Sequence, residues 1–457
     1  MSSTIKRNKY EIDMCNGTIM DKLISFSLPL MLSGILQLMF NAVDIIVIGR
    51  FSGSQSLAAV GSTTALINMF TNLFIGISLG ANVLSARFYA AGKDKEMSET
   101  VHTAITLALI SGIIMVFVGL IFAKPVLELM DTPDDVINLS TLYMRIYFMG
   151  MPFFMLYNYG ASILRAVGDT KRPLFYLIVA GIANAGLNMC LVIIFHLGVA
   201  GVAIGTVISQ LISSILVLRC LYRSETSYQL CFSKLKIQKE YLKQIFQVGI
   251  PAGIQSTVIN FSNVLLQSSV NSFGSIAMAG YTAANNIFGF LYVTVNAVTQ
   301  ACMSFTSQNY GVGKWKRMDR VLIDCLILSF VAMMILGNSA YFFGPKLLTI
   351  YTSNSKVIQC GMEILLYTTV TYFLCGFMDL FPGALRGMGR SGVPMILSII
   401  GTVGTRIVWI FWIFPNHRSL DILFISYPAS WIITIVLQVI CYYFVRKQLY
   451  AKMRAEA

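Results

Sequence analysis

Long apolar runs separated by short polar segments make up most of the chain. Each run reaches the roughly 20 residues that a helix needs to cross the hydrocarbon core of a bilayer. The pattern predicts twelve membrane-spanning helices, over residues 22–48, 56–83, 99–123, 136–160, 173–196, 198–220, 242–271, 278–304, 319–343, 357–383, 394–415 and 422–446. The fourth and tenth are the least regular, because each contains polar residues and a proline. We therefore expect an all-α polytopic membrane protein.

Composition supports the same class. The chain has 457 residues, of which 56% are hydrophobic and 12% charged, whereas a soluble domain carries about 25% charged residues. Its nine cysteines follow no paired spacing and mostly lie inside apolar runs, which predicts neither a disulfide framework nor a metal site. The net charge of +13 would, taken alone, suggest a nucleic-acid partner.

The distribution of the basic residues gives that charge another explanation. Of the 33 lysines and arginines, 26 lie in the two terminal segments and in the connections that follow even-numbered spans. Lysine and arginine collect in the cytoplasmic loops of membrane proteins. The charge therefore predicts topology, with both termini cytoplasmic, and no nucleic-acid partner is needed.

The second half of the chain repeats the first. Pro29 corresponds to Pro251, and the segment LRAVGDTKRP that ends at Pro173 corresponds to LRGMGRSGVP, which ends at Pro394. Register kept through loops indicates duplication. We expect two parallel six-helix bundles related by a pseudo-two-fold axis along the membrane normal, an arrangement that transporters use for alternating access. The predicted lobes are 1–220 and 242–457, joined by a cytoplasmic linker, 221–241.

Polar side chains inside the spans mark candidate site positions, because such groups are costly in a bilayer and usually face a bundle interior or a wet cavity. On the first span Gln37, Asn41 and Asp44 share one helix face. Asn184 and Asn188 repeat this spacing on the fifth span. Further candidates on the fourth, sixth, seventh and tenth spans are Asn158, Thr206, Gln255 and Asp379. We expect the substrate cavity at Gln37, Asn41, Asn158, Gln255 and Asp379.

Structural roles for these polar groups remain open alternatives. Asp44 lies six residues before Arg50 and can be an interfacial acid that pairs near the membrane surface. Asp379 lies close in sequence to Arg386 and can be its structural partner. The amides can serve as hydrogen bonds between helices, each worth on the order of 1 kcal/mol.

Two other features bear on mechanism. Pro29 and Pro251 each remove a helix hydrogen bond, which predicts either a tolerated kink or a hinge. The chain has no GxxxxGK[ST] loop for ATP, and its three histidines form neither HExxH nor a cluster. We therefore do not expect an enzyme.

Together these features resemble the multidrug and toxic compound extrusion (MATE) family over essentially the whole chain. The resemblance rests on the duplicated twelve-span plan, on SLPLMLSGILQLMFNAVDIIVIGRF at 27–51, on GVAGVAIGTVISQ at 198–210 and on the repeated LRAVGDTKRP and LRGMGRSGVP segments. It implies an antiporter that exports amphipathic, often cationic, compounds in exchange for H+ or Na+ and needs no cofactor.

The resemblance also implies a coupling site. One branch of the family carries an acid on the first helix, and Asp44 matches it. The same pattern has an Asn, an acid four residues later and a Thr eighteen residues beyond that. Here these positions are Asn184, Asn188 and Thr206, so the second acid is replaced by an amide. Asp44 is then the sole carboxylate of the ion-coupling site and the expected ligand of any Na+. Asp379 does not match the acid positions of another branch, and that site is not transferred.

The main alternative is a lipid-linked sugar flippase of the same superfamily. Such a protein would favour several arginines or lysines around a pyrophosphate, whereas only Arg145 and Arg406 fall inside the predicted spans. By resemblance we expect a multi-pass protein of the plasma membrane, monomeric, with small amphipathic organic molecules and the bilayer as its partners.

Overall fold

The structure is a computed structural model that describes residues 9–130 and 132–456, without the side chains of Ala65 and of residues 452–456. Every long regular element in the described residues is a helix. Nine of these helices are individually long and apolar enough to cross a bilayer. The expected all-α membrane fold is therefore confirmed. Lys6 and Arg7, which contribute to the predicted cytoplasmic charge, lie outside the described residues.

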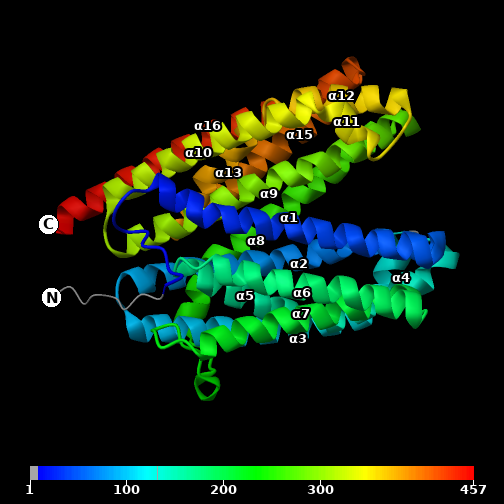
Figure 1. Cartoon of the computed structure of the whole chain (residues 1–457). Coiled ribbons are helices and arrows are strands. Elements are labelled where there is room, and N and C mark those ends of the chain that lie inside the picture. Colours follow the sequence, from blue (N-terminus) through cyan, green and yellow to red (C-terminus); the bar gives the residue numbers. More distant parts are fainter. Residues whose placement is uncertain (1–8, 131, 457) are drawn as a thin grey trace. The chain divides into compact units, whose positions relative to one another are not determined.

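The first half of the chain forms seven α-helices, the sixth of which continues into a π-helical segment (Figure 1). They are α1 Met20–Phe51, α2 Gly53–Ala90, α3 Asp94–Leu129, α4 Asp134–Met149, α5 Met151–Ala166, α6 Lys171–Met189 with η1 Cys190–Ile194, and α7 Gly198–Tyr222. Helices α5, α6 and α7 lie side by side (Figure 1). A short 3-10 turn, η2 (Phe232–Lys234), lies in the connection to the second half.

The second half contains α8 to α16 and is interrupted more often. The elements are α8 Lys239–Asn271, α9 Ser275–Gly311, α10 Trp315–Phe342, α11 Gly344–Thr349, α12 Ser355–Thr369, α13 Tyr372–Gly387, α14 Gly392–Ser398, η3 Ile399–Gly404, α15 Thr405–Val408, η4 Trp409–Ile413, η5 Phe414–Asn416 and α16 Leu420–Glu456. The run from α14 to η5 is one continuous span in which π-helical segments lie on both sides of α15.

Each of the twelve predicted spans falls, to within two residues, inside one helix or inside consecutive helical segments. Several helices run further than predicted, by seven residues at the ends of α2 and α9 and by ten at the end of α16. The two least regular spans are the ones that break. The fourth divides into α4 and α5 at Gly150, with Pro152 in the first turn of α5, where a proline costs no helix hydrogen bond. The tenth divides into α12 and α13, which are bent by 43°.

Equivalent glycines at helix junctions of the two halves adopt the same backbone conformation. Gly53 and Gly274 have φ of 83° and 93°, and Gly92 and Gly313 have φ of 65° and 69°. Both pairs are 221 residues apart in the sequence. Side chains with a Cβ rarely adopt positive φ, so the same left-handed junctions have been kept in both repeats.

The chain divides into two compact units. The first comprises the described part of Met1–Asp13 with Leu28–Gly253, and the second comprises Met14–Ser27 with Ile254–Ala457. The chain changes unit inside α1, just before Pro29, and inside α8, two residues after Pro251. The predicted lobes, 1–220 and 242–457, and the linker 221–241 take their bounds from the loops of the sequence, not from these two units. They stay a prediction.

Within the first unit, α2 and α8 meet backbone to backbone. A Cβ built on Gly76 would lie 2.3 Å from the backbone nitrogen of Gly253, and one on Gly80 would lie 2.2 Å from the carbonyl oxygen of Ile245. A Cβ on Gly249 would likewise lie 2.4 Å from a backbone atom of α2. Each helix thus contributes a GxxxG motif, Gly76 and Gly80 on α2 and Gly249 and Gly253 on α8. Such motifs allow close helix packing in a bilayer, where the hydrophobic effect does not drive helices together.

Candidate functional site

Asp44 is the acidic end of a chain of side-chain hydrogen bonds within the first unit. The amide nitrogen of Asn188 donates to Oδ1 of Asp44 at 2.5 Å and to Oδ1 of Asn184 at 3.2 Å. The amide nitrogen of Asn184 donates to Oγ1 of Thr206 at 3.4 Å. The four predicted ion-coupling residues, from α1, α6 and α7, therefore form one connected group, and their role in coupling stays a prediction.

Two glycines create the room for this group. A Cβ on Gly205 of α7 would lie 2.2 Å from Oδ1 of Asn188, and a Cβ on Gly181 of α6 would lie 1.7 Å from the ring of Phe40. Because neither residue has a side chain, α6 packs closely against α1 and α7. This packing brings the Asn188 amide within reach of Asp44.

The charge of Asp44 has no basic partner among the described residues. The alternative pairing with Arg50 is not observed, and the side chains of Asn188 and Thr206 interact with the carboxylate instead. Oδ1 of Asn188 is itself buried and accepts no hydrogen bond from any described group. A carboxylate and neutral oxygens of this kind are ligands for a proton or a hard cation.

Two tyrosines of α4 complete the surroundings of Asp44, and the sequence reading missed them. Tyr143 and Tyr147 both interact electrostatically with Asp44, and Tyr147 also interacts with the side chain of Gln210. Their rings lie 6.0 Å apart. The i, i+4 spacing of the two residues on the fourth span was the available signal, because it puts both hydroxyls on one helix face.

The remaining candidates of the first unit do not join this group. The side chains of Gln37 and Asn41 are exposed on α1. The amide of Asn158 donates to the carbonyl of Phe154 in its own helix at 2.8 Å, which is the structural alternative considered for such amides. Their assignment to a substrate cavity stays a prediction.

In the second unit, Arg386 connects the two predicted cavity residues. Its Nη2 donates to Oε1 of the buried Gln255 at 2.7 Å. It also interacts electrostatically with the half-buried Asp379 of α13. This geometry favours the structural alternative for Asp379, a partner of Arg386, while a role in substrate binding stays a prediction.

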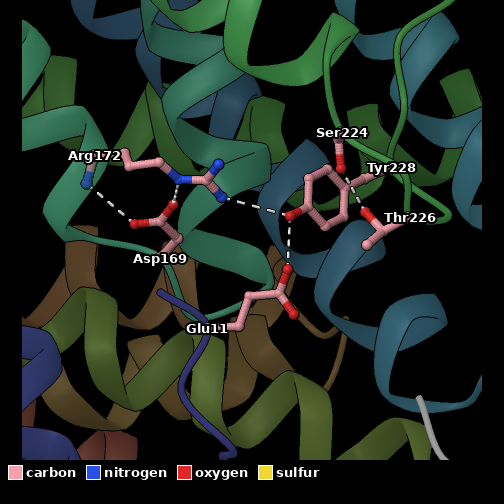
Figure 2. A network of polar contacts seen from close by, with 6 residues as sticks. All are labelled: Glu11, Asp169, Arg172, Ser224, Thr226 and Tyr228. Atoms are coloured by element: carbon pink, nitrogen blue, oxygen red, sulfur yellow. Dashed lines mark hydrogen bonds and ion pairs between the residues drawn. The ribbon is translucent and has the colours of Figure 1, made fainter. Parts of the chain in front are cut away.

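A second polar cluster, formed by loops and helix ends of the first unit, was not predicted from the sequence (Figure 2). Glu11 accepts hydrogen bonds of 2.6 Å from the hydroxyls of Tyr89 and Tyr228. Arg172 pairs with Asp169 and donates to the Tyr228 hydroxyl at 3.5 Å. Burial, together with the Glu11 hydrogen bond, raises the pKa of Tyr228, so its hydroxyl keeps its proton and remains a donor. The cluster anchors the segment before α1 to these loops.

Metal-binding side chains are not clustered in the part of the chain that the structure describes. No group of three or more His, Cys, Asp or Glu residues there could hold a metal ion.

Nine long apolar helices among the described residues, a repeated pattern of junctions and an intramembrane carboxylate bonded to a neutral amide indicate a polytopic membrane transporter. Comparison with known proteins gives the family. The MatE family profile matches twice, over residues 29–190 and 251–412, which together exceed half of the chain. This protein belongs to the MatE family, and the resemblance to multidrug and toxic compound extrusion proteins is confirmed.

Individual relatives agree with the family. The probable multidrug resistance protein YoeA of Bacillus subtilis is 30% identical over 434 residues, which cover 93% of each chain. The multidrug export protein MepA of Staphylococcus aureus is 23% identical and covers 83% of this chain and 84% of its own. An outward-facing multidrug resistance MATE family transporter of the MOP superfamily superposes with a TM-score of 0.89 over 98% of this chain and 100% of its own, at 20% identity. That likeness concerns the fold.

Proposed function

We propose that this protein is a secondary active antiporter that exports amphipathic, cationic drugs or metabolites in exchange for H+ or Na+. The relatives named above for multidrug resistance and export support the drug class. The observation that carries the coupling role is the bond from Asn188 to an Asp44 carboxylate without a basic partner. An ionisable group inside a membrane is by default a functional candidate.

The exchange follows from charge. Unpaired, Asp44 carries one negative charge, which a cationic substrate, a proton or Na+ can each neutralise. Two positive charges at one carboxylate repel each other, so binding of the coupling ion favours release of the drug. Oxygens of Asn184 and Thr206 would supply further ligands if the ion is Na+, and the same carboxylate suffices if it is H+.

Alternating access requires bending within helices, and each of α1 and α8 contains a proline. We propose that Pro29 and Pro251 are hinges for alternating access, because the chain passes from one compact unit to the other within two residues of each. Because Pro29 has no N–H, the carbonyl of Ser25 lacks its helix donor, while Ser33 Oγ donates to the carbonyl of Pro29 at 2.8 Å. Hinge positions typically absorb such backbone changes.

The proposal also covers the membrane, the topology and the oligomeric state of the protein. The basic residues of the even-to-odd connections support cytoplasmic termini, and the family supports the plasma membrane as the location. We propose that the protein acts as a monomer, with small organic molecules and the bilayer as its partners.

The test uses purified protein in liposomes loaded with a fluorescent cationic dye. Dye release is measured under an inward pH gradient and under an inward Na+ gradient, for wild type, Asp44→Asn and Asp134→Asn. Asp134 is a matched control, because it is an exposed carboxylate at the start of α4. We expect release to follow one gradient in wild type and control and to be lost in Asp44→Asn.

Two results would contradict the proposal. Gradient-driven release that persists in Asp44→Asn would remove the coupling role from Asp44 and make Asp379 the next residue to test. No release under either gradient would refute cationic drug export, and flipping of a lipid-linked sugar would then be assayed in the same liposomes.

A further inference from the structure

A buried guanidinium lies in the second unit, within the span that runs from α14 to η5. Arg406 belongs to the single turn α15, and its side chain is only 3% exposed. π-Helical segments lie immediately on either side of it, at Ile399–Gly404 and Trp409–Ile413. Such π-helical irregularities occur frequently at functional sites.

Neutral groups surround the Arg406 charge. Nη1 donates to Oδ1 of Asn263 at 2.8 Å and lies 3.5 Å from Oγ of Ser262, while Nε lies 3.4 Å from Oγ of Ser430. One face of the guanidinium lies over the Tyr427 ring, 4.4 Å from its centroid. Nη2 donates to no described residue, so two N–H groups of the fork remain available.

Carboxylates do not compensate this charge within the described part of the second unit. The acid of α13, Asp379, interacts electrostatically with Arg386. The groups that act on Arg406 are instead the side chains of tyrosines and a cysteine. A buried charge in a membrane protein is expensive and normally has a partner or a function.

The internal repeat relates this position to the Asp44 group. Arg406 lies 222 residues after Asn184, the spacing that also separates the two matched ranges 29–190 and 251–412. Asn263 lies 222 residues after Asn41, which is on the same helix as Asp44. The second unit therefore has a site built from α8, α15 and α16, the counterparts of α1, α6 and α7, and its central charge is positive instead of negative.

Aromatic side chains lie around the guanidinium. The hydroxyls of Tyr281 and Tyr427 are 3.2 Å apart, and Tyr427 lies edge-on to Trp431 at 5.7 Å. Phe424 stacks on Tyr281 at 5.8 Å. Aromatic rings next to a charge-bearing donor suit a ligand with an apolar, aromatic body and a single anionic group.

We propose that Arg406 and its aromatic neighbours bind the carboxylate of an amphipathic aromatic substrate, with Nη2 donating to the carboxylate oxygens. A carboxylate fits better than a phosphate, because one monovalent cation is present and no second basic side chain contacts the group. The inference rests on the proposed export function and assigns one residue of the second unit to the anionic end of a substrate. Guanidinium–carboxylate hydrogen bonds are among the strongest in proteins.

The experiment measures equilibrium binding by purified protein in lipid nanodiscs, without any ion gradient. The probe is dansylglycine, which has a fluorescent aromatic body and a carboxylate, and its neutral counterpart is dansylglycinamide. Fluorescence anisotropy is recorded for wild type, Arg406→Gln, Arg406→Lys and Arg145→Gln. Arg145 is a matched control, because it is an arginine of α4 with an exposed side chain.

We expect wild type and Arg145→Gln to bind dansylglycine about tenfold more tightly than the amide, the effect of roughly one net charge-assisted hydrogen bond. Arg406→Gln should lose this preference, and Arg406→Lys should retain part of it because the charge remains but the fork is lost. The carboxylate-to-amide ratio within wild type needs no variant, so the proposal stays testable if Arg406→Gln does not fold.

The proposal is overturned if wild type binds the two probes equally, or if Arg406→Gln keeps the full preference. A fluorescent cation titrated in the same samples separates this result from the export proposal. Cation binding that depends on Asp44 but not on Arg406 would leave cationic drug export intact even if the carboxylate site fails. Dansylglycine binding at Arg406 without cationic dye export in liposomes would refute the export proposal alone.

Discussion

The crossing of α2 and α8 can be tested by adding a single methyl group at Gly76. A Cβ there would meet the nitrogen and Cα of Gly253 at 2.3 and 2.4 Å, about 1 Å closer than the 3.4 Å at which ordinary contact begins. Both obstructing atoms are backbone, so no side chain can rotate away and the helices must separate. Overpacking of this kind costs about 1–3 kcal/mol.

Gly61 provides the control for Gly76→Ala on the same helix. A Cβ at Gly61 would meet no atom within 4 Å, so Gly61→Ala should gain up to about 1 kcal/mol from helix propensity. The two alanine variants should therefore differ in the free energy of unfolding by about 1–4 kcal/mol. The assay heats detergent-solubilised protein and measures, by size-exclusion chromatography, the fraction that remains monodisperse.

We expect the temperature at which half of the protein remains monodisperse to be several degrees lower for Gly76→Ala than for Gly61→Ala. Equal midpoints for the two variants would refute the reasoning, since they would mean that α2 and α8 separate without cost. A drop in both variants would instead assign the loss to the alanine itself, and the backbone contact would no longer explain it.

Three further predictions concern the site, the hinge and the loop cluster. In Gly205→Ala the new methyl group would lie too close to Oδ1 of Asn188, so gradient-driven export should fall about tenfold, the effect of one hydrogen bond to a charged group. The control Gly186→Ala, whose Cβ would meet no atom within 4 Å, should export at the wild-type rate. Equal export rates for the two variants would contradict the prediction. Pro29→Ala restores a backbone donor and should raise thermal stability while slowing export; unchanged export would argue against a hinge. Glu11→Gln weakens two charge-assisted hydrogen bonds and should lower stability by about 1–2 kcal/mol, whereas an unaltered unfolding midpoint would mean that the cluster does not anchor the segment.

Much of the architecture could be predicted because the bilayer imposes it. A span must supply about 20 apolar residues and satisfy its own backbone, so hydropathy alone located twelve helical spans. It did not locate their ends, because the helices extend up to ten residues beyond the apolar runs. The breaks in the fourth and tenth spans were also visible, since proline and polar residues interrupt the pattern there. The left-handed φ shared by Gly53 and Gly274 is a finding of the structure that agrees with the repeat.

The site was only partly predictable. Helical spacing placed Asn184 and Asn188 on one face, but it could not decide which of them reaches Asp44. That choice depends on how closely α6 approaches α1 and α7, which the missing side chain of Gly205 permits. Tyr143 on α4 is brought near Asp44 by the same packing, although nearly 100 residues separate the two in sequence.

The sequence by itself therefore determined the class of protein, the number of spans, the duplication and the presence of acids inside the spans, at Asp44 and Asp379. Each of these follows from periodicity and composition, which act along the chain. Only the tertiary structure decided which partners the charges have: amides for Asp44, Gln255 for Arg386, and neutral groups alone for Arg406. Partner choice depends on distances between helices of a few ångströms, because hydrogen bonds weaken steeply beyond about 3.2 Å, and local sequence does not encode those distances.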